Sequence, residues 1–198
     1  MPAWVWVSGV VLLIGGIGGW GIWRTLRPPP KIDVSATIAD AQATARARFS
    51  DAVLASISAK YVDPSGIDDL AHNGRVEYRF VSPSRAALPP AATTVGLPHD
   101  NSQDPVCGVE IEFRVFMQGA GSATNDLRGG ACTVPLAHPP SCTVAQVWAE
   151  AIRRGAPNNA IATYLRLEPN DRGEPTWTLE VDPVFRGELP DRCPFPQR

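Results

Sequence analysis

The stretch Val109-Glu-Ile-Glu-Phe-Arg-Val-Phe-Met117 decides the fold class, because apolar and charged side chains alternate along it. A period of two places the apolar side chains on one face of a β-strand and the charged ones on the other. Parallel sheets are covered on both faces, whereas antiparallel sheets often keep one face in water. The alternation therefore predicts an antiparallel sheet with one wet face. We interpret Glu110 and Glu112 as part of that solvated face rather than as a catalytic pair of acids.

Other segments have the same strand character. Residues 53–62 and 75–81 alternate in a similar way. Residues 160–167 and 175–181 flank a turn at 169–173 that is rich in Pro, Asn, Asp and Gly, and this arrangement predicts a hairpin.

Two amphipathic helices are expected, each beginning at a capping-box pattern. The first begins at Thr37-Ile-Ala-Asp40 and the second at Thr143-Val-Ala-Gln146, with Gly155 ending the second. Their apolar faces consist of Ile38, Ala41, Ala45 and Phe49 in the first helix, and Val144, Val147, Trp148, Ala151 and Ile152 in the second. We expect Trp148 in the core, with Trp177 on a strand beneath it. The fold class is therefore α+β, with two helices packed on one face of the sheet.

The two helix-and-strand blocks resemble each other. The two capping patterns stand 106 residues apart, and Ala52-Val-Leu-Ala-Ser-Ile57 aligns with Ala160-Ile-Ala-Thr-Tyr-Leu165. We take a duplicated unit, residues 35–118 and 141–185, as a hypothesis. The alternative is a chance match between alanine-rich segments.

The N-terminus predicts a membrane anchor. Residues 4–23 are apolar and uncharged, with two tryptophans at each end. A helix of this length spans about 30 Å of hydrocarbon, and tryptophan prefers the two membrane interfaces. A cleaved signal peptide would need a basic start and a small-residue cleavage site, which the sequence lacks. The expected parts are a single-pass transmembrane helix at 1–23, a proline-rich linker at 24–34 and a soluble domain at 35–198.

Gly15 and Gly19 have the spacing of small-xxx-small contacts between membrane helices. A protein that dimerises through its anchor is therefore one structural hypothesis. The alternative is that glycine is simply common in membrane helices.

Charge and composition exclude two classes of protein. The chain has 18 Lys+Arg against 20 Asp+Glu, a net charge of −2. Nucleic-acid-binding proteins carry a basic surface, so we expect no nucleic-acid partner. A hydrophobic content of 44% excludes a wholly disordered chain.

All four cysteines, Cys107, Cys132, Cys142 and Cys193, follow the predicted anchor. An even set in a small, loop-rich domain predicts two disulfides and an oxidising compartment. Of the three possible pairings we prefer Cys107 with Cys132 and Cys142 with Cys193. Three basic residues after the anchor favour a cytoplasmic domain instead. We favour export, because each disulfide offsets roughly 3–4 kcal/mol of chain entropy.

Zinc is the alternative explanation of the cysteines. Cys132, His138 and Cys142 would supply three ligands, with Cys107 or Cys193 as the fourth. The spacing lacks the close Cys-x-x-Cys pair of typical structural zinc sites. We therefore predict no metal site.

The sequence has no strong catalytic or cofactor signature. Gly-x-Ser-x-Gly, His-Glu-x-x-His and Gly-Lys-Ser/Thr motifs are absent, and we expect no cofactor. His99 and His138 lie in expected loops, and a hydrolase that uses them is the alternative hypothesis. The acidic groups around Asp68 and Asp171 do not fit a calcium loop, so we interpret both as turns.

Two long connections are expected, at residues 82–105 and 119–140. Long loops on a rigid scaffold often carry the residues that bind a partner. The leading hypothesis is a membrane-tethered extracytoplasmic binding or accessory module, which contacts a protein partner through these loops and the membrane through residues 4–23.

Two segments, Val76-Glu-Tyr-Arg-Phe-Val-Ser-Pro83 and Val147-Trp-Ala-Glu-Ala-Ile-Arg-Arg-Gly-Ala-Pro157, resemble segments of uncharacterised, singly anchored exported proteins of myxobacterial type. The order of helix and strands over residues 35–182 also resembles tandem PepSY-like domains, in topology only. The first resemblance implies a bacterial inner-membrane protein with a periplasmic domain. Neither resemblance implies a catalytic residue or a cofactor.

Overall fold

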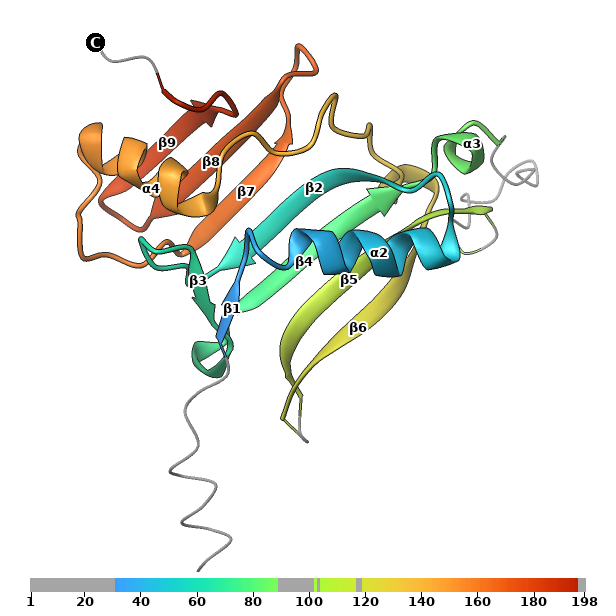
Figure 1. Ribbon diagram of the computed structural model, residues 1–198, viewed down its shortest axis with the longest axis horizontal. Helices are drawn as coiled ribbons and strands as arrows, with labels where there is room; N and C mark the ends of the chain where they lie inside the picture. The colour runs from blue at the N-terminus through green and yellow to red at the C-terminus, as the bar shows by residue number, and fades with distance from the viewer. Residues whose placement is uncertain (1–30, 89–101, 103, 117–118, 196–198) are drawn as a thin grey trace, which may run out of the picture.

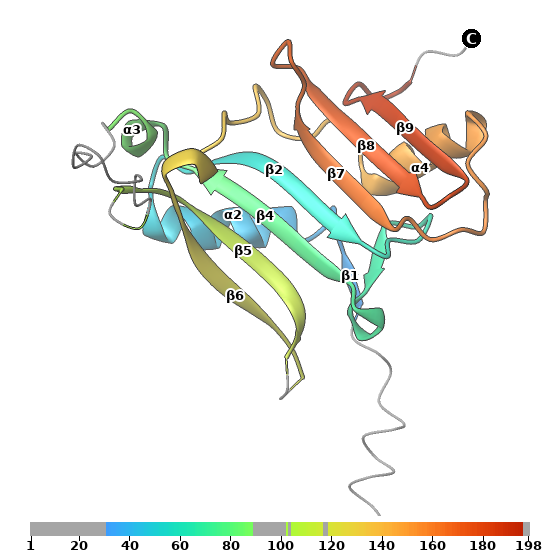
Figure 2. The same cartoon turned by 180° about the vertical axis from the view of Figure 1, so that it is seen from behind.

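The computed structural model describes residues 31–88, 102, 104–116 and 119–195 of the 198. In these ranges an antiparallel sheet carries two longer helices on one face (Figures 1 and 2). The strands are β1 (Lys31–Asp33), β2 (Val53–Lys60), β3 (Ile67–Asp69), β4 (Arg75–Val81), β5 (Val106–Phe116), β6 (Gly119–Arg128), β7 (Tyr164–Pro169), β8 (Pro175–Val181) and β9 (Phe185–Pro190). The helices are α2 (Ile38–Arg48), α3 (Pro83–Ala86) and α4 (Val144–Arg153), with short 3-10 turns at Leu70–His72 and Gly129–Ala131. The predicted α+β class is confirmed.

The main sheet has the strand order β6-β5-β4-β2-β7-β8-β9, and each neighbouring pair is antiparallel. β2 and β7 lie at its centre, and the later strands extend from them to the two edges. Figure 1 shows α2 in front of β2, β4 and β5, and α4 in front of the half formed by β7, β8 and β9. From behind, the strands cover both helices (Figure 2). Among the described residues, no helix lies on the opposite face of the sheet.

The register at the centre of the sheet is symmetric. β2 and β7 pair through Ile57↔Leu167, Ser58↔Arg166 and Ala59↔Leu165. Advancing by 108 residues, the offset at which Ile57 aligns with Leu165, takes Ala59 to Leu167. Exchanging the two strands at this offset therefore turns the Ile57–Leu167 pair into the Ala59–Leu165 pair, with the Ser58–Arg166 pair at the centre. Every antiparallel strand pair has this two-fold symmetry, so a duplicated unit stays a prediction.

The first expected capping box is wrong. The Thr37 hydroxyl does not cap α2; it donates to the carbonyl of Asp33 (2.9 Å) and contacts the Tyr78 hydroxyl (2.5 Å). The Asp33 carboxylate instead accepts the backbone N–H groups of Ser35 and Ala36. Thr37, which the sequence pattern assigned to the start of the helix, therefore belongs to the turn that joins β1 to α2.

The second capping box is confirmed at the start of α4. Thr143 Oγ1 accepts the Gln146 N–H (3.3 Å), and Gln146 Oε1 accepts the Thr143 N–H (2.8 Å). These two hydrogen bonds satisfy two backbone donors at the helix start that would otherwise be unpaired. The buried face of α4 includes Val144, Val147 and Trp148.

The hydrophobic core lies between the helices and the sheet. Trp148 on α4 is 0% exposed and Trp177 on β8 is 1% exposed, as predicted. On the other half, Ala41 and Ala45 of α2 are buried in the same cluster as Tyr78. These alanines are small, so α2 can lie close to the large side chains of β4.

The expected loop over residues 119–140 is wrong in its first half. Gly119–Arg128 forms β6, which pairs with β5 along its length. Its glycine- and serine-rich sequence has low strand propensity, but pairing with a regular neighbouring strand overrides that preference. The short strands β1, β3 and β9 were also not predicted, and β1 takes up the last part of the expected linker 24–34. The other expected loop begins with α3, and its residues 89–101 and 103 lie outside the described ranges.

Residues 1–30 lie outside the described ranges, and with them the predicted anchor at 1–23, Gly15 and Gly19. Among the described residues, none of the helices has the length and hydropathy that a membrane span requires.

Candidate functional site

The central strand pair separates at one end of the sheet. The pairing of β2 with β7 stops at Ile57↔Leu167. The same register would bring Pro169 opposite Ala55, where β2 also has a bulge. Proline has no N–H to donate to a strand ladder, so the pairing ends there. β7 continues to Pro169 paired with β8 alone.

Residues 132–142, the crossing segment, pass the sheet at this separation. The segment leads from the turn at Gly129–Ala131 to α4 on the helix-covered face (Figure 1). Leu136 donates its backbone N–H to the Leu54 carbonyl (2.9 Å), and its side chain is buried in the main core. The crossing segment thus satisfies a β2 carbonyl at the end where β7 no longer pairs.

Each end of the crossing segment is held by a disulfide. Cys132 is bonded to Cys107 on β5, and Cys142 is bonded to Cys193, which follows β9. This is the pairing that we preferred from the sequence. Because all four sulfurs are bonded, no thiolate remains for zinc, and the alternative based on Cys132, His138 and Cys142 is wrong. In the described ranges no group of three or more candidate metal ligands occurs.

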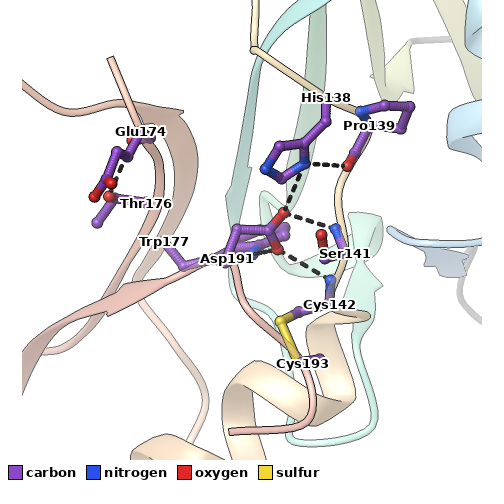
Figure 3. Close-up of polar contacts among 9 residues, drawn as sticks. All are labelled: His138, Pro139, Ser141, Cys142, Glu174, Thr176, Trp177, Asp191 and Cys193. Carbon is purple, nitrogen blue, oxygen red and sulfur yellow. Dashed lines mark hydrogen bonds and ion pairs between the residues drawn. A yellow bond between two sulfur atoms is a disulfide. The ribbon is translucent and has the colours of Figure 1, made fainter. Parts of the chain in front are cut away.

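The carboxylate of Asp191 reinforces the second of these ends (Figure 3). It accepts the backbone N–H groups of Ser141 (2.6 Å) and Cys142 (3.0 Å), together with the indole N–H of Trp177 (2.9 Å). Asp191 is only 2% exposed, so its charge is balanced by these donors rather than by water. The hydrogen bonds of Asp191 and the Cys142–Cys193 disulfide therefore both hold the end of the crossing segment at residues 141 and 142.

His138 lies beside this carboxylate but lacks the geometry of a hydrolase. Its Nδ1 is 2.8 Å from the Pro139 carbonyl oxygen and 3.9 Å from Asp191 Oδ2. A catalytic histidine needs an orienting carboxylate at one nitrogen and a nucleophile at the other. Among the described residues no hydroxyl group hydrogen-bonds to His138, and Asp191 is engaged by three N–H donors. His99 lies outside the described ranges.

A hollow of about 360 Å³ opens on the helix-free face beside the strand separation. The small side chains of Ala55 and Ser56 on β2 lie between Arg79 on β4 and Arg166 on β7. Val134 of the crossing segment and residues of the β7–β8 turn complete its lining. The hollow exists because β7 leaves β2 here and because β2 carries small residues between two long ones.

Hydrogen-bond donors dominate the sides of the hollow. Arg79 Nε donates to Glu110 Oε2 (2.8 Å), and Arg166 pairs with Glu168 through one terminal nitrogen (2.7 Å). A guanidinium has five N–H donors, so most donors of each arginine are not used by these contacts. Ser56 is 7% exposed, and its hydroxyl makes no hydrogen bond among the described residues. The site is therefore concave and places the unused donors of two arginines beside a largely apolar lining.

The charged face of β4 and β5 is less solvated than predicted. Glu112 is only 4% exposed and lies 3.7 Å from Arg75 and 3.5 Å from Arg114. Glu77 is directly opposite Glu112 in the sheet, and burial, followed by the charge of Glu110, raises the pKa of Glu77. These acids form a network of ion pairs with Arg75, Arg79 and Arg114.

The two acidic groups behave differently from each other. Asn170 Oδ1 accepts the N–H groups of Arg172 and Glu174, as expected for a turn. Asp68 is instead a strand residue with no exposure, and neither carboxylate oxygen has a hydrogen bond of good geometry among the described residues. Burial, with Asp69 nearby, raises the pKa of Asp68 to about 7, while backbone groups of Lys60 and Arg75 act against this rise. The interpretation of Asp68 as a turn residue is wrong, whereas Asp63 of the same group forms the expected turn and accepts the N–H groups of Ser65 (2.9 Å) and Ile67 (3.1 Å).

The residues of the hollow were not singled out from the sequence. Ser56, Arg79 and Arg166 look like the solvent-facing residues of alternating strands, and their proximity depends on long-range pairing. A local signal existed in the small residues at 55 and 56 and in Pro169, which cannot continue a central strand pair.

Comparison with known proteins gave no match: no family model, curated protein or solved structure is significantly similar to the chain.

Proposed function

We propose that the chain is an extracytoplasmic binding module, tethered to the membrane by residues 4–23, with the hollow as its binding site. One observation carries this proposal: the crossing segment that lines the hollow is fixed at both ends by disulfides. A wall held in this way is preorganised, which lowers the entropy cost of binding. Binding sites are commonly concave, largely preformed and equipped with a few polar groups.

The two disulfides also support an extracytoplasmic location of the domain. Disulfides persist in the bacterial periplasm and outside cells, and are rare in the cytosol. We therefore assign the domain to the periplasmic side of the inner membrane, as the resemblance to singly anchored exported proteins implies. The relationship to PepSY-like domains and a dimer through Gly15 and Gly19 remain further proposals. A hydrolase has less support because of the geometry at His138.

The binding proposal is tested in intact cells with the full chain. A photo-crosslinking amino acid replaces Val134, which lines the hollow and is 70% exposed. The matched control carries the same amino acid at Val184, which is 64% exposed and precedes β9 on a different surface. Adducts of defined mass at position 134 that are absent at 184 are expected. Equal labelling at the two positions, or none at 134, would contradict a binding site here.

The compartment is tested separately by blocking free thiols in intact cells with a membrane-permeant reagent. Two linked peptide pairs, recovered by mass spectrometry without reduction and after thiol blocking, are expected. Four freely alkylated cysteines would overturn the periplasmic assignment and leave the hollow itself untouched.

A further inference from the structure

We propose that the hollow binds an oxyanion, the carboxylate or phosphate group of its ligand, between Arg79 and Arg166 and above Ser56. This inference rests on the proposed function and names the chemistry of its ligand. It follows from the positions of the two arginines, their unused donors and the Ser56 hydroxyl in the lining of the hollow.

The sheet register sets the two arginines on either side of β2. Arg79 is the direct partner of Ser56 on one side, and Arg166 is the direct partner of Ser58 on the other. Two strand spacings and an offset of two residues along β2 separate their backbones by about 12 Å, a gap that two arginine side chains can close around a small anion. Both side chains project from the helix-free face, because their neighbours Phe80, Leu165 and Leu167 are buried in the core.

The donors in the hollow suit an oxyanion. Arginine binds carboxylate and phosphate through two parallel N–H groups, and each ion pair here leaves such an edge available. Ser56, a residue that is 7% exposed, adds a hydroxyl that lines the hollow and has no protein partner in the described ranges. Hydrogen bonds to a charged acceptor would satisfy this group.

Two carboxylates oppose this attraction, and they provide the sharpest test. Glu168 pairs with Arg166, and Asp171 also lines the hollow. An incoming anion must therefore share Arg166 with Glu168. If the proposal is correct, removing the charge of Glu168 releases the guanidinium and strengthens binding, which a damaged fold could not do.

The experiment uses the ¹⁵N-labelled full chain in detergent micelles at constant ionic strength, titrated with inorganic phosphate or with succinate. The arginine Nε–Hε signals are followed by NMR and assigned by loss of one signal in Arg79→Gln and in Arg166→Gln. Saturable shifts of the Arg79 and Arg166 signals are expected. Phosphate and succinate report separately which oxyanion the site prefers.

Variants decide the outcome. Arg166→Gln should weaken binding, followed through Arg79, by about tenfold, the effect of losing one charged hydrogen bond. Glu168→Gln should strengthen it by roughly fivefold. Arg186→Gln on β9 removes the same charge outside the hollow and should leave the affinity within about twofold. Equal shifts at Arg186, an unchanged affinity in Glu168→Gln, or no saturation with either anion would overturn the proposal. Crosslinking at Val134 together with a failed titration would retain the binding module and reject only its anionic ligand.

Discussion

The indole N–H of Trp177 donates to Asp191 Oδ1 over 2.9 Å, whereas the indole nitrogen of the equally buried Trp148 has no hydrogen-bond partner among the described residues. The two tryptophans thus have the same burial and different polar environments. Trp177 joins β8 to the carboxylate that holds the crossing segment. Trp148 contributes only apolar packing between α4 and the sheet.

This difference predicts unequal effects of the same substitution. Trp177→Phe leaves the buried Asp191 carboxylate without one of its donors, and should cost about 1–3 kcal/mol more in the free energy of unfolding than Trp148→Phe. Each variant loses the same atoms, so Trp148→Phe is the matched control for lost volume. Urea denaturation followed by circular dichroism measures the difference. Equal losses would mean that the Trp177–Asp191 bond contributes nothing to stability.

Truncation of Trp148 measures its apolar contribution. Trp148→Ala opens a cavity in the main core and should cost roughly 3–5 kcal/mol in the free energy of unfolding. Thermal denaturation measures this loss as a lower melting temperature, with the exposed Val184→Ala as control. A melting temperature within a degree or two of the parent would show that α4 packs through a different face.

The sheet could be predicted from sequence wherever the alternation of side chains was strong. The period of two at Val109–Phe113 predicted the strand correctly, because burial on one face dictates that period, but it did not predict the burial of Glu112 on the other face. β6 could not be found in this way, since its small residues carry no alternation and its strand depends on β5. Asp68 was misassigned because aspartates near Pro and Gly usually form turns, whereas here the residue is buried in β3.

The candidate site was harder to predict than the disulfides. The pairing preferred among the three possible ones is confirmed, but the sequence did not indicate that both bonds hold one crossing segment. The hollow depends on Pro169 meeting Ala55, residues that are far apart in sequence and adjacent only in the folded sheet. Arg79 and Arg166 are ordinary surface arginines until the order β4-β2-β7 brings them to either side of Ser56.

The buried Asp68 predicts a pH-dependent stability. Its pKa is raised from the usual 3.8 of an aspartate to about 7 in the folded protein. Below about pH 4 both folded and unfolded states hold the proton, so folding carries no penalty from this group. Between pH 4 and 7 only the folded state holds it, so the stability falls as pH rises, and above pH 7 the penalty is complete.

Asp68→Asn removes this titration and retains a neutral side chain of similar shape. The variant should gain roughly 3–5 kcal/mol relative to the wild type between pH 4 and 8, with the increase spread over that interval. The free energy of unfolding of both proteins, measured by urea denaturation across this range, checks the expectation. Parallel pH profiles for the two proteins would show that Asp68 is ionised in the folded state.

The two disulfides should contribute similarly to stability and differently to the hollow. They close separations of 25 and 51 residues. Loop-closure entropy gives losses of about 3.5 and 4 kcal/mol when each is removed as a pair of serines. At Cys142, however, Asp191 still holds the backbone of residues 141 and 142. The Cys132 end has no comparable carboxylate among the described residues.

Hydrogen exchange with mass spectrometry distinguishes these two ends. Cys107→Ser/Cys132→Ser should speed exchange in peptides that cover Thr133 and Val134, because the wall of the hollow is then held from one side only. In Cys142→Ser/Cys193→Ser, the backbone amides of residues 141 and 142 should still exchange slowly, because Asp191 still accepts both N–H groups. Adding Asp191→Ala to the second variant should release these two amides. If they exchange fast before Asp191 is changed, the disulfide alone holds that end, and the carboxylate serves only Trp177.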